Sequence, residues 1–261
     1  MPMWGPTQLI KKIWILWFQG WDQAPRVARL CLDSWVKLNP NWEIVLLTEK
    51  NITDYVPEAI APRFLSPQKR SDLIRLYLMH AYGGVWTDAS VMCLRPLDEW
   101  LPLREDFWMY RGQRWMKIDG RWHPHEPVGL SGACGWFMAS TKGSRIPLIW
   151  ISAMQSYLGS HGDDDYFLID KTFIELLEVN AEFSDLWLSV PYSNALKLGG
   201  PAALARIETD QNPEVVAEIV KRHPNIIKLT YVDEGLDCNV NSVIREACRL
   251  TGQNFGGQNV G

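Results

Sequence analysis

Several features that would assign the chain to a simple class are missing from its sequence. The five cysteines are scattered and form no Cys-x-x-Cys pair, so neither a zinc knuckle nor a disulfide framework is predicted, and we expect a reducing compartment. Positive charge is not in excess either, because the formal net charge is −4, which argues against a nucleic-acid-binding surface. We therefore expect no nucleic-acid partner.

Long hydrophobic runs are also missing. The apolar run IWILWF at 13–18 has six residues, which is too short for a signal peptide and far too short to span a bilayer. No other stretch is long enough. We therefore expect a soluble, cytoplasmic protein, and a peripheral contact with the inner face of a membrane stays open.

The composition is that of one globular domain. The chain has 261 residues, of which 47% are hydrophobic and 21% charged, and it shows neither an internal repeat nor a linker. We therefore place a single domain at 1–250 and expect a disordered tail at 251–261. The fourteen tryptophans exceed what such a core requires. Some are candidates for stacking on sugars or nucleobases, although an aromatic-rich core explains most of them.

The order of the predicted elements indicates an α/β fold. A buried strand at 11–19, a helix at 25–38 and a second strand at 42–48 form a strand–helix–strand unit, which favours parallel pairing. The first ~100 residues therefore have the pattern of a nucleotide-binding architecture. Later, we expect an irregular functional loop over 96–130, a buried strand at 132–139, helices at 145–158, 166–179, 214–222 and 240–250, and a strand at 226–231.

The stretch from 66 to 96 should bring three polar groups together. A helix that starts at Asp72 climbs about 15 Å, and after a reversal at the glycine pair a strand returns by about 13 Å. Asp72, Arg75 and Asp88 would then meet at one end, and the apolar spacing places Asp72, Arg75 and Met79 away from the core. Such charges cost free energy to desolvate without a purpose or partner. From spacing alone, a functional site and an ordinary surface pair are equally good interpretations.

Two stretches of the sequence carry the central motifs of a resemblance to a known protein family: SDLIRLY at 71–77 and YGGVWTDAS at 82–90. Together they form an SDxxR helix followed by YGGxWxDxS, a specific combination. Further matching pieces are IWILWFQGWDQAP at 13–25, DYFLIDKTF at 165–173 and KLTY at 228–231. Over about two-thirds of its length, the sequence resembles the capsular polysaccharide synthesis glycosyltransferases, which are related to the family of glycosyltransferases with a DxD sugar-binding region.

The resemblance implies a fold and an activity. The fold would be a single GT-A (Rossmann-like) glycosyltransferase domain with C-terminal helices, with a donor-binding part at about 11–100 and an acceptor part at about 101–250. The activity would be transfer of a sugar from a nucleotide diphosphate sugar, and we expect a UDP-sugar. The acceptor would be a saccharide or lipid-linked saccharide in surface or capsular polysaccharide synthesis. Retention of the anomeric configuration and use of Mn²⁺ or Mg²⁺ are also implied.

The resemblance further assigns roles by position. Asp72 and Arg75 would hydrogen-bond the donor sugar, and Asp88 would act in catalysis by contacting ribose and the metal ion. The second acidic position of the family's DxD motif falls on Ser90 here. A metal site at Asp88 and Ser90 is implied, but a neutral hydroxyl is a poorer ligand for a hard cation than a carboxylate, so the metal requirement stays open. Asp165 lies in a stretch that resembles the family and is a further catalytic candidate, although acids there also suit a helix N-terminus.

Three more residues are candidates for nucleotide binding beside Asp88. Gln19 and Gly20 end the first strand, where ligands lie in open α/β sheets; glycine permits close approach, and glutamine can donate to and accept from a base or ribose. Lys228 could neutralise the leaving diphosphate, because cleavage of the anomeric bond builds charge there. The alternatives are an ordinary turn and an ordinary exposed lysine.

Two other classes of protein compete with this interpretation. In the transferase, Trp108, Trp115 and nearby arginines could form an acceptor platform by stacking and charge. A non-catalytic carbohydrate-binding module would explain the tryptophans but not the converging charges. A nucleotidyltransferase of similar architecture would want a glycine-rich phosphate loop after the first strand, and the sequence QGWD at 19–22 is not one.

Overall fold

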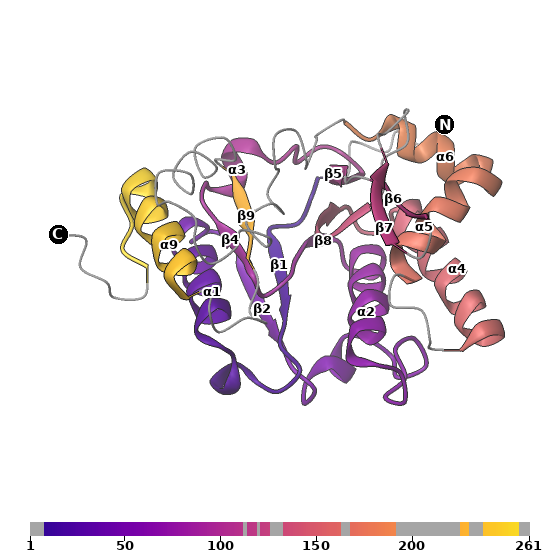
Figure 1. The fold of residues 1–261 in the computed structure, drawn as a ribbon, viewed down its shortest axis with the longest axis horizontal. Coiled ribbons are helices and arrows are strands. Elements are labelled where there is room, and N and C mark those ends of the chain that lie inside the picture. The colour runs from indigo at the N-terminus through magenta and orange to yellow at the C-terminus, as the bar shows by residue number, and fades with distance from the viewer. Residues whose placement is uncertain are drawn as a thin grey trace.

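A five-stranded mixed sheet forms the centre of the molecule in the computed structural model (Figure 1). The structure describes residues 8–111, 114–118, 121–125, 133–162, 168–191, 225–229 and 237–255. In the order in which they lie side by side, the strands are β2 (Glu43–Leu47), β1 (Lys12–Leu16), β3 (Gly84–Thr87), β8 (Ala133–Ser140) and β5 (Phe107–Arg111). β1 pairs parallel with β2 and β3, whereas β8 pairs antiparallel with β3 and β5.

Helices flank this sheet, and two small antiparallel pairs accompany it. The described helices are α1 (Arg26–Leu38), α2 (Pro67–Ala81), α3 (Leu97–Trp100), α4 (Arg145–His161), α5 (Leu168–Val179), α6 (Ala181–Ser189) and α9 (Asp237–Thr251), with short 3-10 turns η1 (Trp21–Gln23) and η2 (Ile52–Asp54). The small pairs are β4 (Val91–Cys93) with β9 (Ile226–Lys228) and β6 (Arg114–Ile118) with β7 (Arg121–His125). In Figure 1, α1 and α9 lie to the left of β1, and α2, α4, α5 and α6 lie to its right.

The predicted strand–helix–strand unit is confirmed, and with it the α/β class. Residues 13–16 of β1 are all buried, as expected for a central strand without polar alternation. α1 begins directly after Pro25, and its buried side chains recur at helical spacing: Val27, Ala28, Leu30, Cys31, Ser34, Trp35 and Leu38. This stripe attaches the helix to the sheet and sets β1 beside β2.

The helix α2 is buried nearly all round, which corrects the expected division into two faces. Leu73 and Leu76 are buried as predicted, but Asp72, Arg75 and Met79 are buried as well. The reason is that α2 lies between the sheet and α4 and also touches α5, so that helices cover the side that the sequence left to solvent. Asp72 and Arg75 are therefore enclosed in the protein.

The glycine pair after α2 allows the chain to reverse where backbones crowd together. Gly83 has φ +73°, and a Cβ there would lie 2.6 Å from the backbone nitrogen of Lys142 and 2.8 Å from the carbonyl oxygen of Ser140. Gly84 has φ +96°, and its Cβ would lie 2.5 Å from the carbonyl oxygen of Lys12. No other residue type fits both conformation and space, so the pair fixes where β3 begins between its neighbours.

One edge of the sheet brings together the chain segments that carry the candidate site residues. β1, β2 and β3 are parallel, so their carboxyl ends share an edge, and Asp88 directly follows β3 there. β8 runs the opposite way, which brings its first residues to the same edge, where the backbone N–H of Asp88 donates to the carbonyl oxygen of Trp136 at 2.9 Å. This is the edge at which open α/β sheets place their ligands.

The prediction of an irregular loop over 96–130 is wrong in its described part. Residues 107–111 form β5, and β6 and β7 pair with each other. Trp108 is only 4% exposed and lies with its ring centroid 5.6 Å from that of Trp100 and 5.9 Å from that of Phe137. It belongs to the core and offers no acceptor platform. The side chain of Trp115 lies outside the described residues.

The C-terminal half departs from the sequence expectation at further points. α6 was not expected, and the predicted helix at 214–222 and the end of the strand at 226–231 fall outside the described residues. The start of the expected disordered tail packs on the protein, because Phe255 is fully buried and the Lys37 ammonium lies 5.8 Å from its ring centroid. None of the described helices combines the length and the apolar character that crossing a bilayer requires.

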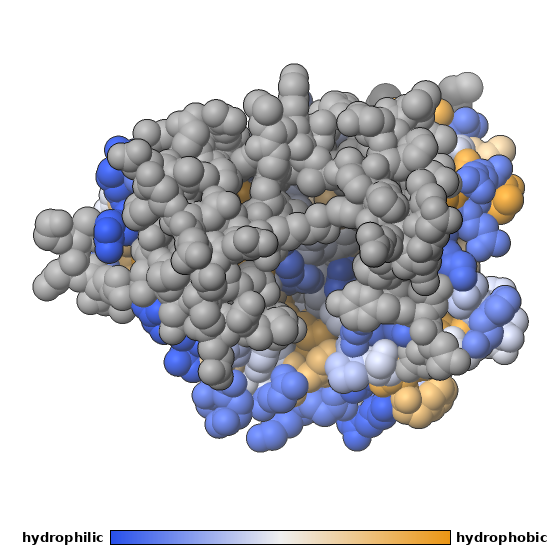
Figure 2. Space-filling view, in the orientation of Figure 1, coloured by the Kyte–Doolittle hydropathy of each residue, from blue (hydrophilic) through white to orange (hydrophobic). Residues whose placement is uncertain are grey.

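Exposed apolar side chains are dispersed over the surface. Figure 2 shows small hydrophobic areas separated by hydrophilic residues on the face drawn there. The large apolar residues that are exposed come from separate elements: Ile10, Val36, Phe64, Val179, Leu188 and Leu250. This pattern indicates no single docking patch among the described residues.

Candidate functional site

Asp88 is the centre of the polar cluster at the sheet edge. Its Oδ2 lies 2.7 Å from Nζ of Lys228, and its Oδ1 accepts a hydrogen bond of 3.0 Å from Nε1 of Trp86. Nη2 of Arg75 lies 3.6 Å from the same Oδ1. Burial raises the pKa of Asp88, but the two cations and the hydrogen bonds outweigh it, so its pKa lies below the ordinary value. Asp88 is therefore held ionised.

Arg75 connects the helix α2 to this carboxylate and is fixed from several sides. Its Nη2 lies 3.0 Å from Oδ1 of Asp72 and donates to Oγ of Ser71 at 3.2 Å. Its Nη1 donates to the carbonyl oxygen of Gly135 at 2.7 Å, and the guanidinium lies 5.3 Å from the ring centroid of Trp86. Nε also donates to the carbonyl oxygen of Ser71 at 3.4 Å, so this planar cation is preorganised and keeps one N–H of Nη1 for a further partner.

One carboxylate oxygen of Asp72 makes no hydrogen bond to the described residues. The residue is 3% exposed, and its Oδ2 is buried with no hydrogen-bond partner within the described part of the chain. Burial raises the pKa of Asp72 to about 6, with a further contribution from Asp88, and the Arg75 guanidinium opposes this increase. A buried, unpaired acceptor is expensive, so a ligand hydroxyl at this oxygen would relieve the cost.

Asp170 joins the same cluster, and the sequence did not single it out. It lies in the first turn of α5, where burial and then the charge of Asp72 raise its pKa to about 7, and Arg75 opposes them. The predicted candidate Asp165 lies outside the described residues. Asp165 and Asp170 both belong to the stretch DYFLIDKTF at 165–173, which resembles the family. The resemblance therefore pointed to this stretch, but the sequence analysis chose its first aspartate instead of its second.

Lys228 reaches Asp88 through a strand pairing that no local pattern shows. It is the last residue of β9, where it pairs with Val91 of β4, just after Asp88 in the chain. The two partners of the ion pair are 140 residues apart in sequence. The alternative of an ordinary exposed lysine is wrong, because the side chain is 21% exposed and paired.

Gln19 and Gly20 follow β1 on the expected side of the sheet, but β1 ends at Leu16, so they belong to the turn after the strand and do not end the strand itself. Gly20 has φ +97°, and its N–H donates to the carbonyl oxygen of Trp17 at 3.1 Å, so it closes a tight turn. Gln19 is exposed, and Nε1 of Trp21, just beyond the turn, is buried with no acceptor among the residues that the structure describes. Their role in nucleotide binding stays a prediction.

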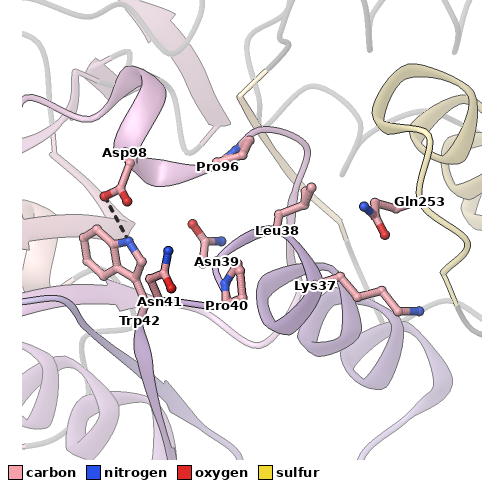
Figure 3. Close-up of a pocket in the computed structure, with 9 residues that line it drawn as sticks. All are labelled: Lys37, Leu38, Asn39, Pro40, Asn41, Trp42, Pro96, Asp98 and Gln253. Atoms are coloured by element: carbon pink, nitrogen blue, oxygen red, sulfur yellow. Dashed lines mark hydrogen bonds between the residues drawn. The ribbon is translucent and has the colours of Figure 1, made fainter.

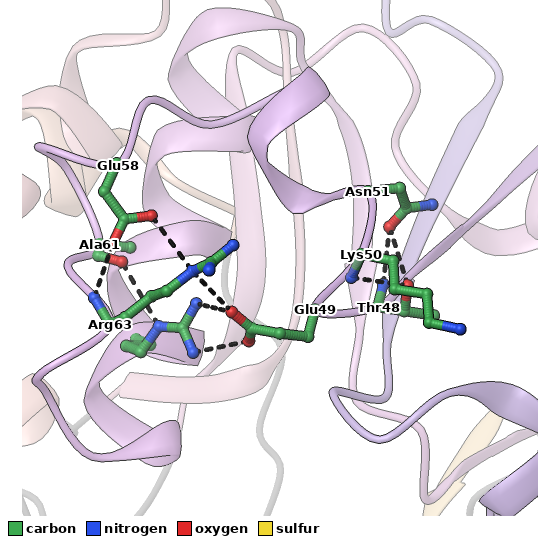
Figure 4. A network of polar contacts seen from close by, with 8 residues as sticks. Thr48, Glu49, Lys50, Asn51, Glu58, Ala61 and Arg63 are labelled. Atoms are coloured by element: carbon green, nitrogen blue, oxygen red, sulfur yellow. Dashed lines mark hydrogen bonds and ion pairs between the residues drawn. The ribbon is translucent and has the colours of Figure 1, made fainter.

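A network around Glu49 fixes the loops that follow β1 and β2 (Figure 4). Glu49 receives two hydrogen bonds from Arg70 at 2.7 and 3.0 Å, and Nε of Arg63 lies 3.1 Å from its Oε1. The Arg70 guanidinium lies 4.8 Å from the ring centroid of Phe18, in the segment after β1. This bidentate pair holds the start of α2 against both loops at the same sheet edge.

A separate pocket lies at the other end of the parallel strands. It has a volume of about 330 Å³ and is lined by Lys37, Leu38, Asn39, Pro40, Asn41, Trp42, Pro96, Asp98 and Gln253 (Figure 3). Trp42 directly precedes β2, so the pocket lies at the amino end of that strand. Nε1 of Trp42 donates a hydrogen bond to Oδ1 of Asp98 at 3.1 Å. It is therefore not part of the Asp88 cluster.

The residues at Asp88 do not fit a divalent cation well. Within the described ranges, no group of three or more His, Cys, Asp or Glu side chains could hold a metal ion. Ser90 is 3% exposed, its carbonyl oxygen accepts from the N–H of Leu229 at 2.8 Å, and both oxygens of Asp88 already face N–H groups. The expected use of Mn²⁺ or Mg²⁺ at Asp88 and Ser90 stays a prediction, and this donor set weighs against it.

Several known proteins that resemble parts of this chain are named as sugar-transferring enzymes. The "O-glycosyltransferase braB" of Annulohypoxylon truncatum is 26% identical over 140 residues, which are 48% of this chain and 30% of that protein. The "Initiation-specific alpha-1,6-mannosyltransferase" of Candida albicans is 26% identical over 102 residues, which are 35% of this chain and 26% of that protein. The chain thus spans less than a third of the length of these relatives.

A solved structure and a family model extend over most of the chain. The structure "PaToxG Glycosyltransferase" covers 95% of this chain and 89% of its own at 11% identity, with a TM-score of 0.44. The model of the family described as "Capsular polysaccharide synthesis protein" matches residues 5–246, far more than half of the sequence. The chain therefore belongs to the capsular polysaccharide synthesis protein family.

Proposed function

We propose that the chain is a glycosyltransferase with a GT-A domain that uses a nucleotide diphosphate sugar, a UDP-sugar, as its donor. The acceptor would be a saccharide or lipid-linked saccharide in the synthesis of a surface or capsular polysaccharide. A lipid-linked acceptor would place the reaction at the inner face of a membrane. One observation carries the proposal: Asp72, Arg75, Asp88 and Lys228 converge at the ligand-binding edge of the sheet.

The sugar would bind at the helix α2. The unpaired Oδ2 of Asp72 can accept a hydrogen bond from a sugar hydroxyl, and Arg75, fixed at 3.0 Å from Oδ1 of Asp72, can donate to another. A pair of one acceptor and one donor on a rigid helix defines the orientation of a polyhydroxylated ring. Since both groups are enclosed by the fold, bound water is displaced and the hydrogen bonds gain strength.

The nucleotide would bind along the ends of the neighbouring strands. Asp88 is held ionised and can accept hydrogen bonds from ribose hydroxyls, because each carboxylate oxygen has more than one acceptor site. Gln19 and Gly20 lie in the turn that follows β1, the neighbour of β3, where a base or ribose would reach them. Lys228 would carry the positive charge that the leaving diphosphate needs.

The names of the relatives support sugar transfer but leave the sugar open, since they include both an O-glycosyltransferase and a mannosyltransferase. Retention of configuration rests on the family resemblance. The competing classes explain less of the geometry. A carbohydrate-binding module has no need of a carboxylate held ionised between two cations, and the turn after β1 is not a glycine-rich phosphate loop.

A donor screen tests the proposal. The purified protein is incubated with a series of nucleotide sugars, and release of nucleoside diphosphate is measured with and without added saccharide acceptors. We expect selective turnover of one donor, a UDP-sugar. Saccharide binding without turnover of any donor would favour the binding module, and release of pyrophosphate from a nucleoside triphosphate and a sugar phosphate would favour the nucleotidyltransferase.

A further inference from the structure

Each oxygen of the Asp88 carboxylate already faces a donor or a cation. Nζ of Lys228 lies 2.7 Å from Oδ2, and Nε1 of Trp86 donates to Oδ1 at 3.0 Å. Nη2 of Arg75 lies 3.6 Å from Oδ1. A divalent cation that bound Asp88 would share its oxygens with the ammonium and the indole N–H, and it would lie beside two fixed positive charges that repel it.

The described residues offer no acid at the second position where a metal ligand was expected. The position two residues after Asp88 holds Ser90, which is 3% exposed and whose backbone is tied to β9 through the bond from the N–H of Leu229. In the part of the chain that is described, no cluster of three or more metal-binding side chains occurs. Hard divalent cations prefer several oxygen ligands, and at Asp88 and Ser90 the described structure offers one carboxylate, already engaged, and one buried hydroxyl.

Lys228 is placed to do what such a cation would do. It is held by the pairing of β9 with β4, and its neighbours Ile226 and Ile227 are fully buried, so the position of its backbone is fixed. Its side chain is 21% exposed, so the ammonium lies near the surface of the site rather than in the core. Asp88 uses one N–H of the ammonium, and its other N–H groups can bind phosphate oxygens.

We infer that Lys228, in place of a divalent cation, neutralises the diphosphate of the donor, so that donor binding and transfer do not require Mn²⁺ or Mg²⁺. The inference rests on the proposed function and identifies how that site handles charge. The bond between C1 of the sugar and the diphosphate oxygen breaks, and its electron pair stays on the diphosphate. The acceptor hydroxyl oxygen forms the new bond to C1 and gives its proton to the departing diphosphate, while Lys228 stays protonated throughout.

Binding of two probes, UDP and inorganic pyrophosphate, tests this inference by calorimetry in EDTA and in MnCl₂. Pyrophosphate contains the group that Lys228 would bind and does not depend on recognition of a base. We expect UDP and pyrophosphate to bind in EDTA with affinities within about twofold of those in MnCl₂. Lys228→Gln should weaken both in EDTA by at least about tenfold, which corresponds to about 1.4 kcal/mol, whereas Lys228→Arg should keep most of the affinity.

Two control variants keep the experiment interpretable. Lys142→Gln removes an exposed lysine after β8 and should bind both probes as the wild type does. If Lys228→Gln unfolds because Asp88 is left without its partner, the double variant with Asp88→Asn removes both charges and should still bind pyrophosphate weakly.

The outcomes separate the inference from the proposed function. Binding of UDP that appears only with Mn²⁺, or a Lys228→Gln protein that binds like Lys142→Gln, would overturn the inference and leave a nucleotide-sugar enzyme in place. Pyrophosphate binding that depends on Lys228 in EDTA, without turnover of any donor, would support the inference and count against the proposed function. Failure of both probes under both conditions would overturn both.

Discussion

Replacing Asp170 by asparagine should increase the free energy of unfolding, and this gain should be much larger at pH 8 than at pH 5. In the folded protein, burial and the charge of Asp72 raise the pKa of Asp170 from 3.8 to about 7, against the opposing effect of Arg75. The unfolded chain releases this proton near its ordinary pKa, so ionisation costs the folded state free energy as pH rises from about 4 to about 7. Asparagine does not ionise and avoids this cost.

The size of the effect follows from the pKa difference. About three pKa units at 1.36 kcal/mol each give about 4 kcal/mol as an upper bound. Because Asp170 is only partly buried, solvent screens its charge, and we expect a gain of about 1–2 kcal/mol at pH 8. For a protein of this size that gain corresponds to an increase in Tm of about 2–8 °C. At pH 5 the gain should fall to less than half.

Urea unfolding of the wild type and Asp170→Asn at several pH values between 5 and 8.5 measures this difference. Asp185→Asn, at an exposed position of α6, serves as the matched control and should change stability little at any pH. A variant that is less stable than the wild type at pH 8, or a gain that does not depend on pH, would refute the placement of Asp170 beside Asp72.

Two further predictions concern the framework of the site. Arg75→Met should lower the free energy of unfolding by about 3–5 kcal/mol, because it leaves the buried Asp72 carboxylate without its partner, whereas Arg145→Met, at an exposed ion pair, should cost less than about 1 kcal/mol. Equal losses in urea unfolding would show that the Asp72 pair is not enclosed. Gly83→Ala should destabilise more than Gly143→Ala, because both have positive φ but a Cβ meets backbone atoms only at Gly83. Equal Tm values for the two alanine variants would contradict the close approach at β3.

The first part of the fold and the core of the site could be predicted from the sequence. Apolar runs, helical spacing and the glycine pair are local signals, and they placed β1, α1, β2, α2 and β3 in the right order. The rise per residue of a helix and a strand was enough to bring Asp72, Arg75 and Asp88 together, and the distances of 3.0 and 3.6 Å from Arg75 confirm it. Local geometry decides such short-range convergence.

The remaining features depend on contacts between distant segments. The ion pair between Lys228 and Asp88 forms because β4 and β9, two short strands far apart in sequence, pair with each other. The local sequence of neither strand predicts this pairing. The burial of the polar face of α2 depends on α4 and α5, which follow much later. Trp108 looked like a surface aromatic because prolines and arginines surround it, but its strand pairs with β8 in the core.

Donor turnover by the Asp88→Asn variant tests the proposed activity most directly. With the donor identified by the screen, release of nucleoside diphosphate is compared for the wild type, Asp88→Asn and the exposed control Asp185→Asn, after unfolding midpoints show that all three are folded. We predict a loss of about 100-fold or more for Asp88→Asn, because an amide cannot keep the charge that Lys228 and Arg75 surround. Turnover by Asp88→Asn equal to that of the wild type would contradict the assignment of this cluster as the active site.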